Sequence, residues 1–152
     1  MKEDKGVKAA LFLSAVAILL LAPSAQGRSR NTTPFEYVGG TTSMPGGCEG
    51  KLEVTEADLV FRCGEGSISV PYDSITRMEY RPQISKQIRK MKLDWAVKPP
   101  SSYSRNKAYF SVLYSEKGQT HAMVLKAPPE AMRPYMAEID LRTGRPIHSR
   151  QD

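Results

Sequence analysis

The sequence contains few of the residues that enzymes and metalloproteins use, with two cysteines, two histidines and one tryptophan among 152 residues. His121 and His148 lie far apart in the chain and are too few for most metal sites. The motifs GxSxG, HExxH, GxGxxG and the Walker phosphate-binding loop do not occur. We therefore expect no catalytic residue, no metal and no cofactor, and we interpret the protein as not an enzyme.

No apolar run is long enough to cross a membrane as a helix, which takes about 20 residues. The longest run, Ala9 to Ala22, has 14 residues and follows a basic stretch that contains Lys2, Lys5 and Lys8. Ala25-Gln26-Gly27 then has the small-x-small form that signal peptidases prefer. These features predict that residues 1–27 are a cleaved signal peptide and that the protein is secreted or periplasmic. The alternative is an uncleaved N-terminal anchor.

The 125 residues after this segment are enough for one domain with one core. Residues 28–47 are rich in Gly, Ser and Thr, which predicts a flexible lead. Residues 48–147 are expected to form the folded domain, and residues 148–152 a polar tail.

Two cysteines in an exported chain favour a disulfide. The apolar alternation over residues 51–63 predicts a hairpin in which Val54 pairs with Leu59. This register brings Cys48 close to the position of Cys63, and neighbouring glycines allow the chain to bend there. We expect a Cys48–Cys63 disulfide at the base of the hairpin. The rival reading, a thiol pair for redox or metal chemistry, lacks a CxxC spacing and a nearby His ligand set.

Short apolar runs separated by turn residues continue along the chain, which is typical of an all-β domain. Pro128 and Pro129 end this pattern and open a helix, and Gly144 is a suitable C-terminal stop for it. Seven strands are predicted, at 51–54, 58–63, 68–72, 75–80, 91–97, 108–114 and 119–126.

The segment RPQISKQIRKMKLDWAVKPP, residues 81–100, fits two periodicities. As a helix it places Ile84, Ile88 and Trp95 on one stripe but leaves Leu93 on the charged face. As a strand, residues 91–97 place the apolar side chains of Met91, Leu93, Trp95 and Val97 on one face, with no large apolar residue on the other. We therefore predict a strand at 91–97 and a loop or short helical turn at 83–90.

This order of elements resembles the pleckstrin-homology-like barrel, including its GRAM-type variants. The matching stretches are GKLEVTEADLVF (50–61), SISVPYDSITRMEY (67–80), AYFSVLYSEKG (108–118) and the closing helix with LRTG (141–144). The resemblance implies a mainly β fold, a bent barrel of seven antiparallel strands capped by a C-terminal α-helix. The nearest likeness is to small exported bacterial proteins with no assigned activity.

The family also includes phosphoinositide binders, which use a basic cluster in the loop between the first two strands. The corresponding loop predicted here, residues 55–58, is Thr-Glu-Ala-Asp and acidic. The lipid site of the family therefore does not carry over to this chain.

Positive charge is concentrated in residues 81–100, whose net charge of +5 equals that of the whole chain after residue 27. Such localisation indicates a binding surface for an anionic partner. We expect an exported, non-catalytic binding or scaffold module, whose partner is an anionic envelope polymer, lipid headgroups or an acidic protein. No nucleic acid is expected, because the protein is exported. The predicted binding residues are Arg81, Lys86, Arg89, Lys90 and Lys92.

Two other functions are compatible with the sequence. The first is a protein–protein interaction module in which the charge is incidental. The second is a small hydrolase that uses His121, although a histidine on a strand face is more often a packed residue than a base.

Overall fold

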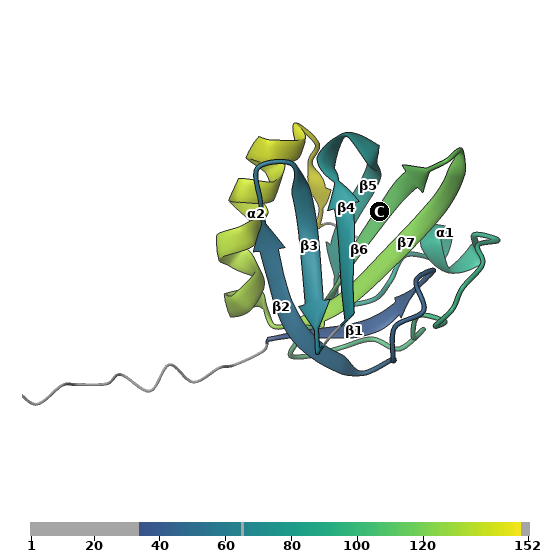
Figure 1. Ribbon diagram of the computed structural model, residues 1–152. Coiled ribbons are helices and arrows are strands. Elements are labelled where there is room, and N and C mark those ends of the chain that lie inside the picture. The colour runs from purple at the N-terminus through teal and green to yellow at the C-terminus, as the bar shows by residue number, and fades with distance from the viewer. Residues whose placement is uncertain (1–33, 65, 150–152) are drawn as a thin grey trace, which may run out of the picture. The chain divides into compact units, whose positions relative to one another are not determined.

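The computed structural model describes residues 34–64 and 66–149 (Figure 1). The predicted signal peptide, residues 28–33 of the predicted lead and residues 150–152 of the predicted tail lie outside this part of the chain. The described residues form a mainly β fold with a C-terminal helix, as predicted. None of their helices is both long and apolar enough to span a membrane.

The strands belong to one bent sheet with the order β4-β3-β2-β1-β7-β6-β5-β8. All neighbours are antiparallel except β5 and β8, which are parallel. The prediction of seven antiparallel strands is therefore wrong, because the described residues form eight strands in a mixed sheet. The strands are β1 Phe35–Gly40, β2 Cys48–Val54, β3 Asp58–Cys63, β4 Gly66–Pro71, β5 Ile75–Arg81, β6 Ala108–Glu116, β7 Gln119–Ala127 and β8 Ile147–His148. The helices are η1 Tyr72–Ser74, α1 Lys86–Lys90 and α2 Pro129–Thr143.

Strand β1 corrects the prediction of a flexible lead at 28–47. Phe35 and Tyr37 are fully buried, and β1 pairs with β2 on one side and β7 on the other. The folded region therefore begins by Phe35 and not at Cys48. The physical reason is that β1 joins the two halves of the sheet, so its apolar side chains are buried by strands from both.

The C-terminal boundary also differs from the prediction. His148, assigned to the polar tail, lies in β8 and pairs with Glu79 of β5. The neighbouring residue Ile147 is buried, and its backbone N–H donates to Asp140 Oδ1 at 3.2 Å. The turn after α2, with Gly144 in the left-handed conformation at φ 62°, directs the chain back to the sheet.

The predicted strand at 91–97 is wrong. Only Val97 makes a β-bridge, with Gly40, while α1 occupies 86–90, in agreement with the predicted short helical turn. Met91, Leu93 and Trp95 pack instead on the outer face of the sheet. Every second side chain of this segment faces the sheet, which explains the alternation although the segment is not a strand.

The β2–β3 hairpin has the predicted register, with Val54 opposite Leu59. The predicted disulfide between Cys48 and Cys63 is present, with the two Cα atoms 6.0 Å apart. It links the start of β2 to the end of β3. Gly50 of β2 lies so close to β3 that an added Cβ would collide with the carbonyl oxygen of Arg62.

The sheet carries apolar clusters on both faces. The main core fills the inside of the bend, where α2 contributes the fully buried Met132 and Ile139. A second, smaller cluster lies on the outer face, where residues 84–95 cover β6 and β7. Figure 1 shows α2 and α1 on opposite sides of the strands. The second cluster holds the basic segment against the sheet, and it positions the site described next.

Candidate anion-binding site

Strand β5 carries an unusual charged row on the outer face of the sheet. Because side chains alternate along a strand, Met78 and Tyr80 face the main core while Arg77, Glu79 and Arg81 face outward. Glu79 and Arg81 are nevertheless buried, and Arg77 is half-buried. The charged row is consequently partly buried and not freely solvated.

Glu79 is the centre of this row and is 1% exposed. Arg77 Nε donates to Glu79 Oε1 at 2.7 Å, and Arg81 Nε lies 3.8 Å from Glu79 Oε2. A buried carboxylate needs such counter-charges, because its desolvation is costly. Two guanidinium groups share one carboxylate, so the trio retains one net positive charge.

Helix α1 brings further positive charge to the same place. Ser85 caps the helix, its Oγ accepting from the Ile88 backbone N–H at 3.3 Å, and Ile88 itself is fully buried in the second cluster. Arg89 Nε donates to the carbonyl of Ile84 at 3.1 Å, which orients its side chain. Lys86 is exposed on the same helix.

These two elements and the residues between them line an open cavity of about 380 Å³, which we call the basic recess. This volume lies within the range typical of small-ligand sites. Four of the lining residues are basic and none is acidic, so the recess is positively charged even after the charge of Glu79 is counted. The lining residues are Arg77, Arg81, Gln83, Ile84, Ser85, Lys86, Gln87 and Arg89.

The structure brings together three of the five predicted binding residues, namely Arg81, Lys86 and Arg89. Lys92 does not line the recess but lines two other cavities, one beside His121 and one beside Trp95, which are described below. Lys90 is exposed on α1 and lines none of these three cavities. Sequence reasoning missed Arg77, because the charge count began at residue 81. The signal was present in the two-residue spacing of the charged residues Arg77, Glu79 and Arg81, which places them on one strand face.

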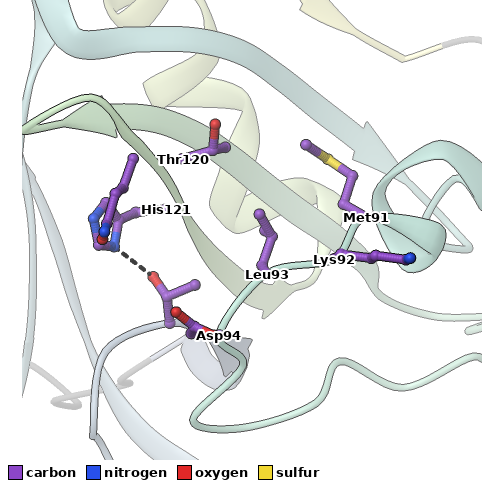
Figure 2. A pocket seen from close by; sticks show the side chains of 8 residues that line it. Met91, Lys92, Leu93, Asp94, Thr120 and His121 are labelled. Atoms are coloured by element: carbon purple, nitrogen blue, oxygen red, sulfur yellow. Dashed lines mark hydrogen bonds between the residues drawn. The ribbon is translucent and has the colours of Figure 1, made fainter.

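His121, the candidate base, lies in a separate cavity of about 480 Å³ (Figure 2). Its Nδ1 is 3.1 Å from Thr41 Oγ1, its Nε2 is 4.0 Å from Glu116 Oε2, and its ring stacks on Tyr114. Thr41 Oγ1 also accepts from the Ala122 backbone N–H at 3.2 Å. These contacts give Thr41 and His121 a structural role where the chain leaves β1 beside β7.

The acidic, histidine and cysteine side chains of the described residues do not form a second site. Among residues 34–64 and 66–149, no three His, Cys, Asp or Glu side chains are grouped so that they could hold a metal ion. Both cysteines are in the disulfide. Within the described chain, the basic recess is therefore the arrangement with the clearest chemical capacity, namely the binding of an anion by guanidinium and ammonium groups.

The recess has what anion recognition requires. Arg77 and Arg89 are each oriented by a hydrogen bond, and guanidinium groups can donate two parallel hydrogen bonds to carboxylate, sulfate or phosphate. Lys86 adds a flexible charge at the rim. Comparison with known proteins adds no assignment: no family model matches the chain, and no curated protein sequence matches it significantly.

Proposed function

We propose that the protein is an exported, non-catalytic binding module whose basic recess binds an anionic group of an extracellular ligand. The observation that carries this proposal is the convergence of four basic side chains, two from β5 and two from α1, on one cavity. Glu79 lies beside the recess but is buried and engaged by two arginines. An incoming anion would thus meet a net positive surface.

Export is supported by the Cys48–Cys63 disulfide, since structural disulfides persist in oxidising compartments. It agrees with the proposed signal peptide at residues 1–27. An extracellular or envelope location makes polymers and headgroups with carboxylate, sulfate or phosphate groups the available ligands.

The fold is proposed to be of the pleckstrin-homology-like type. The sheet order from β4 to β5 and the packing of α2 near β2 and η1 support this assignment. The parallel strand β8 is an addition to the seven-stranded pattern. The loop between the first two strands, TTSMPGG at residues 41–47, carries no charge, which supports a ligand site different from the lipid site of that family.

The alternative of a protein-interaction module with incidental charge has less support. In the part of the chain that the structure describes, only two large apolar side chains are strongly exposed, Tyr103 at 60% and Leu141 at 82%. Single exposed apolar residues are normal on protein surfaces. In the basic recess, by comparison, hydrogen bonds hold the side chains of Arg77 and Arg89 in place.

The test uses inorganic triphosphate, a compact polyanion, and measures its Kd by calorimetry at low and high salt. We expect binding that weakens as salt rises, because charge pairs are screened. Lys86→Gln should weaken binding by about tenfold, the value of one charge-assisted hydrogen bond.

Lys90→Gln is the matched control, since Lys90 is also exposed on α1 but lies outside the recess. It removes the same charge from the same helix and should leave the Kd nearly unchanged. Absence of salt-sensitive binding, or an equal loss in both variants, would show that the recess is not the site.

A further inference from the structure

A second cavity, of about 670 Å³, shares one lining residue with the basic recess. This residue is Arg89. The second cavity, which we call the tryptophan pocket, adds Lys92 and Lys98 as cations and Asp94 as an acid. Trp95 also lines it.

The linings of the two cavities together contain six basic residues, and we call the two cavities the track. Asp94 is the one acidic residue in the lining of the track, and it lies in the tryptophan pocket and not in the recess. A single phosphate or carboxylate would occupy only one end. The arrangement is suited to a ligand that carries several separate anionic groups along its length.

Trp95 distinguishes the second cavity from the first. It is partly buried, because it packs against the second cluster and also lines the tryptophan pocket. Its Nε1 donates to the Met91 carbonyl at 3.4 Å, which restrains the ring. The ring thus offers a fixed aromatic surface beside cationic side chains.

An aromatic surface next to cations selects ligands with two properties. The ligand must have an apolar face for the electron-rich face of the indole, and it must carry negative charge near that face. A pyranose ring of an acidic sugar has both, because its C–H groups form one flat face and its carboxylate lies at the edge. A membrane surface is flat, and it would not enter two concave cavities.

We propose that the ligand is an acidic polysaccharide rich in uronic acid. One sugar ring packs on Trp95 with its carboxylate at Arg89 or Lys92, and the chain continues past Arg89 so that a further carboxylate enters the basic recess. This inference rests on the proposed function of the recess and specifies its ligand class.

Single-stranded nucleic acid is the competing class, because it also binds to basic grooves with aromatic side chains. Such grooves stack successive bases on several rings, whereas the described residues that line the track include only one aromatic ring, that of Trp95. The disulfide also favours an extracellular ligand. The polysaccharide is thus the better fit, and the oligonucleotide is an outcome of the test.

The experiment uses the intrinsic fluorescence of Trp95, the only tryptophan of the chain. A uronic-acid hexasaccharide should change the emission of Trp95 in a saturable way, and the uncharged hexasaccharide of the same linkage should not. An oligothymidylate of equal charge should bind more weakly than the uronic-acid hexasaccharide. The inference is overturned if the emission is unchanged at saturation, if the uncharged sugar binds equally well, or if the oligothymidylate binds more tightly.

Substitutions of Trp95 separate this inference from the proposed function. By anisotropy of a labelled hexasaccharide, Trp95→Leu should bind about tenfold more weakly, the cost of losing one aromatic stacking contact, and Trp95→Phe should retain most of the affinity. Both variants should bind triphosphate with the wild-type Kd, which also shows that they are folded. If the hexasaccharide affinity is the same in all three proteins, the inference fails while the recess stands. If triphosphate does not bind to the wild-type protein, the proposed function itself fails.

Discussion

The guanidinium of Arg77 and the carboxylate of Glu79 form a short ion pair on the outer face of β5, with Nε 2.7 Å from Oε1. Glu79 is 1% exposed, whereas the side chain of Arg77 is 29% exposed and reaches the recess. Arg81 approaches the other carboxylate oxygen. The buried acid thus holds two arginines in place, and its charge matters both for folding and for the shape of the recess.

Replacing Glu79 by Gln keeps the side-chain shape but removes this charge. Because Arg77 and Arg81 then lose their shared counter-charge, the free energy of unfolding should fall by about 3 kcal/mol, as measured by urea denaturation. Glu53→Gln is the control, since Glu53 pairs with Arg62 at 3.1 Å in an exposed position. It should cost less than about 1 kcal/mol. Equal losses in the two variants would contradict a structural role for Glu79.

Ile88 connects the second cluster to the helix that lines the basic recess. Its side chain is fully buried beneath α1, so Ile88→Ala should lower the free energy of unfolding by about 2–5 kcal/mol. Because the same helix carries Lys86 and Arg89, triphosphate binding should also weaken, as measured by calorimetry under conditions where the variant is folded. Lys90→Ala, an exposed position of α1, should change neither quantity. A variant that is destabilised but binds normally would show that the cluster does not position the recess.

The disulfide between Cys48 and Cys63 closes a loop with a sequence separation of 15. Loops of this size are expected to stabilise a fold by about 3 kcal/mol through restriction of the unfolded chain. A thiol reductant should therefore lower the urea midpoint of the wild-type protein. The double variant Cys48→Ser/Cys63→Ser should begin at this lower midpoint and should not respond to the reductant. An identical midpoint for all samples would contradict the prediction.

A buried tyrosine, Tyr37, and a partly buried one, Tyr80, predict loss of stability at alkaline pH. Burial raises the pKa of Tyr37 to about 12, with a smaller contribution from Tyr114. Burial also raises the pKa of Tyr80 to about 12, with Glu130 adding to the shift and Arg133 opposing it. Unfolded phenols ionise near pH 10. The contribution of these groups is therefore complete below about pH 10 and is lost as the pH rises from 10 toward 12.

The measurement is the free energy of unfolding between pH 8 and pH 12, taken from urea titrations. In the wild-type protein it should fall above about pH 10, and in Tyr37→Phe it should fall less steeply because one phenol is absent. Tyr37→Phe also loses the hydrogen bond to the Thr42 carbonyl, so its stability at neutral pH should be lower. The comparison therefore concerns the slope with pH and not the absolute value. Equal slopes would refute the assignment.

Local sequence signals predicted the parts of the fold whose contacts are close in the chain. The register of the β2–β3 hairpin followed from alternation across a short turn, and the disulfide followed from that register. The stop of α2 at Gly144 followed from the conformational freedom of glycine at a helix end. In each case the partners are near neighbours, so the pattern of side chains carried the information.

Two of the wrong predictions concern segments whose environment is built by distant residues. Strand β1 is composed of residues typical of loops as much as of strands, and it is ordered by pairing with β7, more than 80 residues later. Residues 91–97 have the alternation of a strand but cover the outer face of the sheet. Periodicity shows that one side of a segment is buried, but it does not show which element buries it.

The sequence by itself determined that the protein is mainly β, that its two cysteines can pair, and that its positive charge is concentrated between residues 81 and 100. Only the tertiary structure decided which charges act together. It joined Arg77 to Lys86 and Arg89, assigned Lys92 to the neighbouring cavities, and left Lys90 on the exposed side of α1. The reason is that charge density is a property of composition, whereas the recess forms where the fold brings residues of α1 and β5 to one cavity.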